Sequence, residues 1–308
     1  MNRSMRSAPG FARRTLWHCL ALACALGTAP LSAQIPDSAQ IASGGDTVYE
    51  VRLEDGSVLF GRIVAVAGLR VVMVTQGGVR LELQRAQIRE AQPLRGTVQP
   101  DGEVWPEDPN RTRLFFGPTG RALRAGEGYL GAFELFLPFV AIGLTDYFTI
   151  AGGTPIVPEA IGRVIYLAPR LQIVRSEDVQ ISTGALVFFD LTGGGEDPLG
   201  IMFGAATFGS NDEAVTLGAG WGFAGSDVAN QPAVLIGGEA RLNRRVKLIT
   251  ENYFMSLDDE EILLLGAGIR IFGERLTGDL GLGFGGGAAD FECCIPLVNF
   301  VYNFGSGR

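Results

Sequence analysis

The feature that most constrains this chain is an alternation of side chains within residues 126–304. In Val215–Phe223, apolar side chains occupy every second position, and threonine or glycine stands between them. Leu280–Phe284 follows the same pattern, with glycine in the alternate positions. Because successive side chains of a β-strand point to opposite faces, these segments are predicted to be strands with one apolar face and one polar or glycine face.

We divide this region into twelve candidate strands, many of them close in length to a tilted strand that crosses a bilayer. A soluble barrel has an apolar interior and a charged exterior. Here the polar faces carry few charges, which favours a barrel whose apolar face meets lipid. The candidate strands are 127–136, 139–144, 148–154, 164–174, 179–189, 200–208, 214–223, 233–242, 246–255, 262–272, 276–284 and 297–304.

Composition narrows the fold class further. The chain contains 44 glycines in 308 residues; 47% of its residues are apolar and 19% are charged, against about 25% charged in a typical soluble domain. Such a chain is too apolar to be disordered, and this much glycine would destabilise helix interiors by about 1 kcal/mol per site. No stretch after residue 33 is long and apolar enough for a membrane helix. The prediction is an all-β protein.

The predicted connections alternate in length. They are short at 145–146, 175–178, 209–213, 243–245 and 273–275, and longer at 155–163, 190–199, 224–232, 256–261 and 285–296. The first hairpin, at Leu137-Pro138, departs from this rule. Outer-membrane barrels have short periplasmic turns and longer extracellular loops. The pattern therefore predicts an antiparallel up-and-down transmembrane barrel of about twelve strands, with both ends in the periplasm.

The last predicted strand carries a motif. Phe300, Tyr302 and Phe304 stand at alternate positions, and the segment resembles the C-terminal barrel-assembly signal of bacterial outer-membrane β-barrel proteins. Residues 305–308 follow the final Phe, which departs from that signal. The resemblance implies a single-chain barrel in the outer membrane of a Gram-negative bacterium, in contact with membrane lipid and the barrel-assembly machinery. It implies no substrate.

The part before the barrel is predicted to hold a targeting signal and a small domain. Residues 1–33 have the basic start, short apolar stretch and small-residue exit of a secretory signal peptide. Asp55-Gly56 marks a tight hairpin in a compact β-rich stretch, which we interpret as an SH3-like periplasmic module that binds cell-wall components or acts as a spacer. The basic segment Arg111–Ala125 lies at the membrane face or enters the barrel. The predicted divisions are a signal peptide (1–33), a linker (34–46), the SH3-like module (47–92), a second linker (93–125) and the barrel (126–304).

Removal of the signal peptide excludes several classes of function. It takes away four arginines and His18, the only histidine, which leaves 21 basic and 33 acidic residues and a net charge of about −12. Such acidity disfavours nucleic acid as a partner. Without histidine, a Ser-His-Asp or Cys-His nucleophile and a histidine-ligated metal site are excluded. We predict no catalytic residue, no cofactor and no metal site.

Polar residues on the inner faces of the predicted strands are the candidate functional residues. In a barrel they point into the lumen, where they set ion selectivity or pair with one another inside a plugged interior. Glu239 and Glu251 are predicted on neighbouring strands, near Arg241 and Arg270. The lumen candidates are Arg170, Gln172, Glu239, Arg241, Glu251, Arg270 and Asp279.

Three further features are less specific. Cys293 and Cys294 form a disulfide with each other or between chains, or stay reduced. The acidic loop 258–261 suits Ca²⁺ in composition, but its spacing matches no EF-hand and a solvated loop explains it. Aromatic residues suited to the two membrane interfaces are Phe188, Phe189, Trp221, Tyr253 and Tyr302.

Three functions are compatible with these observations. The first is an outer-membrane barrel with a structural role or a passive role in the passage of small solutes. The second is a plugged barrel that displays acidic loops for adhesion or binding at the cell surface. The third is a secreted soluble β protein that binds an apolar ligand.

Overall fold

The structure is a computed structural model of the chain, and it describes residues 48–75, 77–99, 103–158, 160–192, 197–257, 260–273, 275–286 and 291–305. These residues fall into two compact units, one up to Leu94 and one from Arg95 onward. The predicted signal peptide and first linker lie outside the described residues. The described part of the chain contains no helix with the length and hydropathy needed to cross a membrane.

Five antiparallel strands form the first unit. A 3₁₀ turn, Arg85–Gln87, precedes the last of them, and Val51, Val71 and Met73 lie in a fully buried apolar core. Gly56 has a φ of 87°, a left-handed conformation that glycine adopts without steric cost, in the predicted hairpin turn. The SH3-like assignment stays a prediction. In the order β4-β3-β2-β1-β5, the strands are β1 (Val48–Leu53), β2 (Val58–Ala67), β3 (Arg70–Thr75), β4 (Arg80–Gln84) and β5 (Ile88–Pro93).

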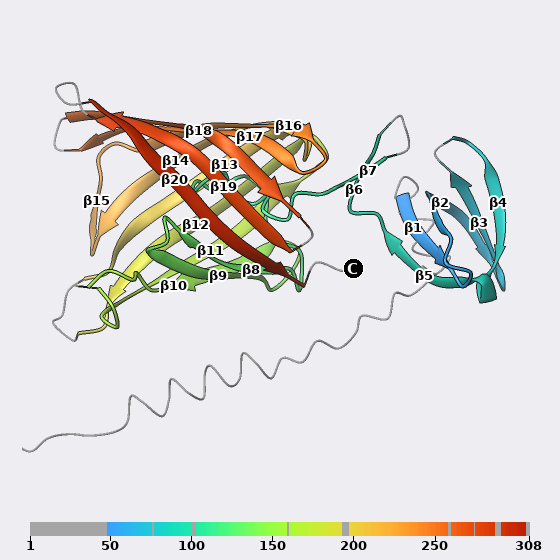
Figure 1. Cartoon of the computed structure of the whole chain (residues 1–308). Coiled ribbons are helices and arrows are strands. Elements are labelled where there is room, and N and C mark those ends of the chain that lie inside the picture. Colours follow the sequence, from blue (N-terminus) through green and yellow to red (C-terminus); the bar gives the residue numbers. More distant parts are fainter. Residues whose placement is uncertain are drawn as a thin grey trace, which may run out of the picture. The chain divides into compact units, whose positions relative to one another are not determined.

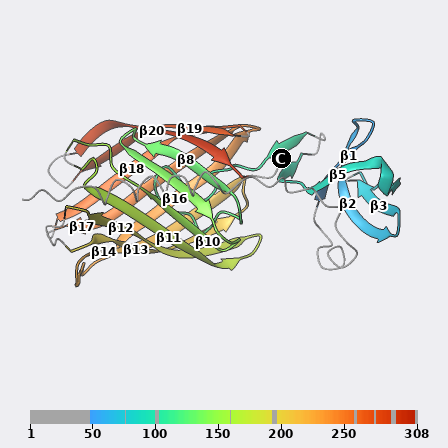
Figure 2. The ribbon, with the colours of Figure 1, turned by 90° about the horizontal axis from the view of Figure 1, so that it is seen from below.

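The second unit is built around a closed antiparallel barrel of twelve strands (Figures 1 and 2). The ring closes because β20 pairs with β8 and β13 pairs with β14. The predicted all-β fold and strand number are confirmed. The barrel strands are β8 (Gly128–Phe133), β9 (Leu137–Gly143), β10 (Phe148–Gly153), β11 (Val164–Arg175), β12 (Val179–Asp190), β13 (Leu199–Gly209), β14 (Glu213–Ala224), β16 (Ala233–Asn243), β17 (Val246–Leu257), β18 (Glu260–Phe272), β19 (Leu276–Gly286) and β20 (Phe291–Phe304), and the short β15 (Asp227–Val228) adds to β14.

The sequence alternation separates the two faces of the barrel wall. On β14, Val215, Leu217 and Trp221 are 42% to 50% exposed, whereas Thr216 between them is 1% exposed. In the described strands, charged residues occupy inward positions or strand ends, and the outward positions between them are mostly apolar. The barrel therefore has an apolar outer surface, the reverse of a soluble barrel.

The two ends of the barrel differ, and we name them for their connections. The turn end contains the hairpins after β9, β11, β13, β16 and β18, the start of β8 and the end of β20. The loop end contains the remaining connections, of which 154–163 is the longest. The first hairpin turns at Glu134–Phe136, where Glu134 and Leu135 have positive φ, and not at Leu137-Pro138.

Two connections at the loop end are shorter than predicted. The last strand begins at Phe291 and not at residue 297, because β19 and β20 stay paired as far as Gly286 and Phe291. Strands β17 and β18 also stay paired, as far as Leu257 and Glu260. Backbone hydrogen bonds do not depend on side-chain hydropathy, so these ladders continue past the point where the apolar alternation ends.

A hairpin precedes the barrel strands in the second unit. This mouth hairpin consists of β6 (Gly96–Val98) and β7 (Val104–Pro106). Thr97 Oγ1 donates a hydrogen bond of 3.0 Å to Asp212, and the Trp105 ring lies 5.3 Å from the Arg241 guanidinium. The hairpin therefore contacts the turn end of the barrel.

Candidate functional site

Residues 107–125, which we call the lumen segment, run inside the barrel from its turn end (Figures 1 and 2). Their bonding partners lie on strands all around the ring. Thr149 on β10 accepts from the Leu123 N–H, Ser182 on β12 donates to the Thr119 carbonyl, and Asn299 on β20 donates to the Phe115 carbonyl.

The lumen segment is among the most buried parts of the chain. Leu114, Phe115 and Thr119 are 0% exposed. The prediction of a linker at 93–125 is therefore wrong for residues 107–125. Of the two positions predicted for Arg111–Ala125, the membrane face and the inside of the barrel, the structure shows the second. The physical reason is that the apolar and basic side chains of this segment find apolar and acidic partners on the inner wall.

The tip of the lumen segment is a tight turn. The Leu114 N–H donates to the Gly117 carbonyl at 2.9 Å, and Leu114 and Phe115 pack in an apolar cluster with wall residues. The carboxylate of Glu251 on β17 accepts hydrogen bonds from the Phe116 N–H (3.0 Å), the Gly117 N–H (2.9 Å) and the Tyr253 hydroxyl (2.7 Å). One carboxylate of the wall thus holds the tip in place.

Behind the tip, two arginines share one buried carboxylate. Asp279 on β19 lies 2.6 Å from Arg113 of the lumen segment and 2.7 Å from Arg270 on the neighbouring β18. All three side chains are at most 2% exposed. Arg270 also donates to Asp108 and to the carbonyls of Asn110, Arg113 and Leu114. Its guanidinium donors are therefore matched by acceptors, as a buried charge requires.

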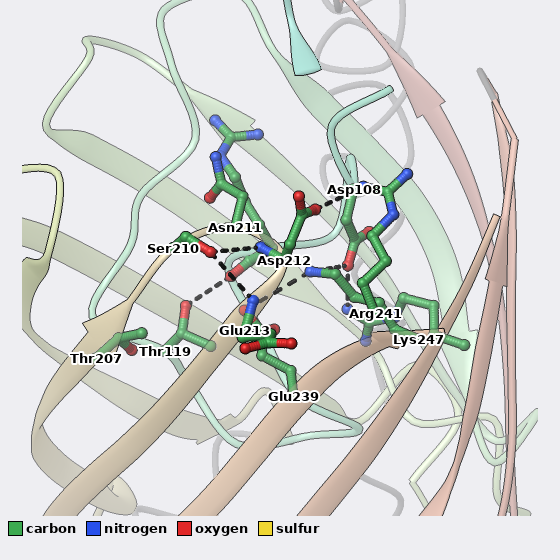
Figure 3. A network of polar contacts seen from close by, with 12 residues as sticks. Asp108, Thr119, Thr207, Ser210, Asn211, Asp212, Glu213, Glu239, Arg241 and Lys247 are labelled. Carbon is green, nitrogen blue, oxygen red and sulfur yellow. Dashed lines mark hydrogen bonds and ion pairs between the residues drawn. The ribbon is translucent and has the colours of Figure 1, made fainter. Parts of the chain in front are cut away.

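A second charged cluster shares Asp108 with the first, and Figure 3 shows its residues Asp108, Glu239 and Lys247. Lys247 on β17 is fully buried, and its ammonium lies 3.4 Å from Asp108 and 3.7 Å from Glu239 on β16. Glu239 also pairs with Arg121 of the lumen segment. The Lys247 ammonium makes these ion pairs without a hydrogen bond, and one oxygen of Glu239 has no hydrogen-bond partner.

A third charged cluster lies where the lumen segment enters and leaves the barrel. Glu127, just before β8, lies 2.8 Å from Arg111 and 2.7 Å from Arg95, and Glu107 lies 2.7 Å from Arg124. Burial alone would raise the pKa of Glu127, but Arg111 and Arg124 outweigh it and hold this pKa at about 2. The pKa of Glu107 is lowered by the same balance. Both carboxylates are therefore ionised near neutral pH.

The structure places all seven predicted lumen residues on the inner side of the wall. Arg170 donates to the Thr112 carbonyl (2.6 Å), and Gln172 accepts from the Ala122 N–H (3.1 Å). With Glu239, Glu251, Arg270 and Asp279, they contact the lumen segment. Arg241 instead pairs with Asp212 in a turn, at 2.9 Å. Of the seven, Arg270 and Asp279 pair with each other across adjacent strands, and Glu239 pairs across strands with Lys247. The lumen segment supplies partners to most of the seven.

Sequence reasoning missed several residues of this site. Lys247 was not singled out, although it stands at an inward position one residue after the start of its strand. The arginines of the lumen segment form a basic stretch in the sequence, and their acidic partners are inward residues of distant strands. That match was available as a signal, since an acidic chain concentrates Arg111, Arg113, Arg121 and Arg124 in one short stretch.

Beyond the tip, toward the loop end, the inner wall changes character. The side chains that face the lumen there are apolar and mostly half-buried, and Phe116 at the tip is 36% exposed. Leu264 is 38% exposed and lies against Gly285, and Leu297 lies against Gly266. We call this region the loop half of the lumen. Its apolar residues include Phe116, Phe133, Leu186, Phe188, Ile201, Tyr253, Met255, Leu264 and Leu297.

The remaining predictions have mixed outcomes. Trp221 and Tyr302 face outward, but Phe188 and Tyr253 pack with the lumen clusters and are not interfacial residues, since their strand positions point inward. Phe300 and Tyr302 are exposed on β20, which ends at Phe304. Their role as an assembly signal stays a prediction.

Two predictions fall partly outside the described residues. Cys294 takes part in a disulfide, whereas the Cys293 side chain lies outside the described part. Most of the acidic loop 258–261 lies outside it too. Among the residues that are described, no group of three His, Cys, Asp or Glu could hold a metal ion.

Comparisons with known proteins give structural likenesses only. No family model and no curated protein matches the chain. A KdgM porin is 8% identical, with a TM-score of 0.42 over 58% of this chain and 98% of the porin. A loop-deletion mutant of OmpT, an outer membrane protein of Vibrio cholerae, is 15% identical, with a TM-score of 0.35 over 83% of this chain and 96% of OmpT. None of these scores reaches 0.5, so the likenesses do not identify a function.

Proposed function

We propose that this protein is an outer-membrane β-barrel whose lumen is closed at rest by its own lumen segment. The observation that carries this proposal is the set of buried ion pairs between that segment and the wall, above all Arg113 with Asp279 and Arg121 with Glu239. Breaking a buried pair by removing one partner leaves an uncompensated charge, so the seated segment is strongly favoured over a partly withdrawn one.

The outer surface supports the location in a membrane. Large apolar side chains are exposed around the ring, for example Leu171, Val215, Leu248, Leu280 and Phe300 at 42% to 57%. A soluble protein rarely exposes a continuous apolar surface of this kind, whereas lipid would cover it. The secreted soluble alternative is therefore disfavoured.

The two ends of the barrel support one orientation. Short turns and both ends of the barrel segment share the turn end, which in outer-membrane barrels faces the periplasm. Arg95, the first residue of the second unit, pairs with Glu127 at this end. We therefore propose that the unit formed by β1 to β5 is periplasmic, where cell-wall components are its candidate partners.

A barrel filled in this way is not a steadily open diffusion pore. Passage of small solutes would require the lumen segment to move, and a plugged barrel that presents its loop end at the cell surface needs no such movement. The part of the chain after the predicted signal peptide has no histidine, so a histidine-dependent nucleophile is not proposed.

Conductance in planar bilayers tests the closed lumen. The full-length protein should give no steady channel, whereas an Arg113→Ala/Arg121→Ala variant should open frequently because two of the buried pairs are gone. Arg244→Ala is the matched control, since the Arg244 side chain is 52% exposed and its ion pair with Glu103, at 3.5 Å, is also exposed. A steady conductance of the unaltered protein as large as that of the double variant would disprove the proposal.

Fractionation of cells that express the protein tests its location. We expect recovery with the outer membrane after a carbonate wash and solubilisation by detergent only. Recovery in the soluble periplasmic fraction without detergent would overturn the membrane assignment and revive the secreted soluble alternative.

A further inference from the structure

We propose that the loop half of the lumen binds an organic cation with an apolar body. This inference rests on the proposed function, because the loop half opens to the outside only if the barrel spans the outer membrane with its lumen closed toward the periplasm. It follows from three features of the site, which are its floor, its inner wall and its rim.

The floor combines an aromatic surface with a carboxylate directly beneath it. Phe116 is 36% exposed, although Leu114 and Phe115 beside it are sealed. Its backbone N–H and the Tyr253 hydroxyl both donate to the carboxylate of Glu251, a residue that is 4% exposed. A cation over the Phe116 or Tyr253 ring would meet the negative face of the ring and the field of that carboxylate together.

The wall around this floor is apolar and partly accessible. Phe133 and Phe188 pack at one side of the lumen, and Leu264 and Leu297 line another side. Arg113 already lies 5.5 Å from the Phe133 ring, so the rings of Phe116, Phe188 and Tyr253 are the better ones for a ligand. Apolar walls of this kind favour a ligand that gains by leaving water.

The residues at the rim of the loop half favour a positively charged ligand. At the loop end the connecting segments are rich in acids, and Arg163 is the only basic residue in their sequence. A predominantly negative rim around a low-dielectric lumen concentrates cations and repels anions. The acidic residues that the structure describes there include Glu134, Asp190, Asp197, Asp227 and Glu261.

Together these features disfavour a ligand that is only positively charged and a ligand that is only apolar. A small hydrated cation gains nothing from the apolar wall, and an apolar anion is repelled by the rim and by Glu251. An ion that is both apolar and positively charged matches the rim, the wall and the floor at once.

Two probe ions of the same size and opposite charge test the inference. The full-length protein in nanodiscs of zwitterionic lipid is dialysed against tetraphenylphosphonium or tetraphenylborate, and binding to empty nanodiscs is subtracted. We expect saturable binding of about one tetraphenylphosphonium per barrel and at least tenfold weaker binding of tetraphenylborate. Equal binding of the two ions, preference for the borate, or no saturable binding of the phosphonium would overturn the inference.

Substitutions at Leu264 locate the site. Leu264→Lys should weaken phosphonium binding about tenfold, and Leu264→Glu should strengthen it, because the two variants differ in the sign of the new charge. A shift in the same direction for both would contradict binding in the loop half. If neither variant folds, the contrast between the two probe ions in the unaltered protein still decides the matter.

Conductance of the same preparation separates this inference from the proposed function. If the barrels are closed but bind no phosphonium, the proposal of an organic-cation ligand is wrong and the proposal of a closed lumen stands. Steady open channels would overturn the closed lumen, whatever the probe ions do.

Discussion

The two halves of the lumen differ although the same strands build both. In the turn half, the inward residues Lys247, Arg270 and Asp279 are fully buried and each has partners of opposite charge. In the loop half, inward residues such as Phe188 and Leu264 are apolar and partly exposed. The strand alternation is the same in both halves. They differ in the inward residues of the wall and in the lumen segment, which fills the turn half and pairs with its charged residues.

This comparison shows what a polar inner face is for in this barrel. A charged side chain is costly to bury unless it is paired and hydrogen-bonded. The turn half meets that condition through a segment of the same chain, and the result is a specific filling rather than a water channel. The loop half has no such filling among the described residues, and it also has fewer groups that would require one.

The largest effect is expected from the removal of a shared carboxylate in the turn half. Asp279→Ala would leave Arg113 and Arg270 buried without their common partner, and we expect a loss of about 3–5 kcal/mol in the free energy of unfolding. Urea unfolding in detergent micelles, followed by the gel shift between folded and unfolded barrel, measures it.

An exposed pair at the same end provides the control for this prediction. Arg244→Ala removes an ion pair whose partners are 52% and 46% exposed, and it should cost about 0–1 kcal/mol. Equal losses for Asp279→Ala and Arg244→Ala would mean that the ion pairs of the turn half do not hold the filling in place.

The strands were predictable because one rule acts everywhere along the wall. Lipid outside and polar groups inside impose a period of two, so Val215–Phe223 and Leu280–Phe284 could be assigned from single segments. Strand ends were less predictable: β20 begins at Phe291, in a stretch where no face has to be apolar and only backbone pairing decides.

Of the candidate site, the sequence predicts the residues on the barrel wall but not their partners in the lumen segment. Arg270 and Asp279 are predictable as inward residues because they stand on the polar or glycine face that alternates with the apolar face. Their partners Asp108 and Arg113 lie in a stretch without periodicity, rich in proline and glycine, that reads as a linker. Tertiary pairing between segments more than 150 residues apart, such as the 162 residues between Asp108 and Arg270, leaves no local pattern in the sequence.

The next largest loss of stability is expected from a glycine substitution in the turn half, compared with one in the loop half. A Cβ at Gly237 would overlap Leu114 of the tip, whereas a Cβ at Gly222 would meet its first neighbour, the Gly200 carbonyl, only at 3.9 Å. Gly237→Ala should therefore cost about 1–3 kcal/mol by overpacking, measured by the same urea unfolding.

Gly222→Ala is the matched control in the loop half. It should be neutral or stabilising by up to about 1 kcal/mol, because it restricts the unfolded chain without creating a clash. If Gly237→Ala were tolerated as well as Gly222→Ala, the tip would not be seated against β16 as described.

Strong acid should loosen the turn end of the barrel. The pKa of Glu127 is about 2 in the folded protein, against an ordinary value of 4.5, so its stabilising contribution is complete above pH 4.5 and is lost as the pH falls toward 2. In a Trp17→Phe/Trp221→Phe background, Trp105 of the mouth hairpin is the remaining tryptophan and reports this change by fluorescence.

Two variants give this prediction its controls. Glu127→Gln should weaken the acid transition of Trp105, because Arg111 then keeps only one of its two carboxylate partners, Glu107 at 3.3 Å. Glu177→Gln, in an exposed turn, should leave the transition unchanged. An acid transition that is the same with and without the Glu127 carboxyl would show that this group does not control the turn end.

The smallest effect is expected in the loop half. Leu264 is 38% exposed, so Leu264→Ala removes few contacts and should cost less than about 1 kcal/mol in the free energy of unfolding. Leu235→Ala is the matched variant in the filled part, because Leu235 is 5% exposed and packs on the tip, and it should cost about 2–5 kcal/mol. Similar costs for the two leucines would mean that the loop half is packed as tightly as the turn half, and the difference between the halves would then be one of polarity alone.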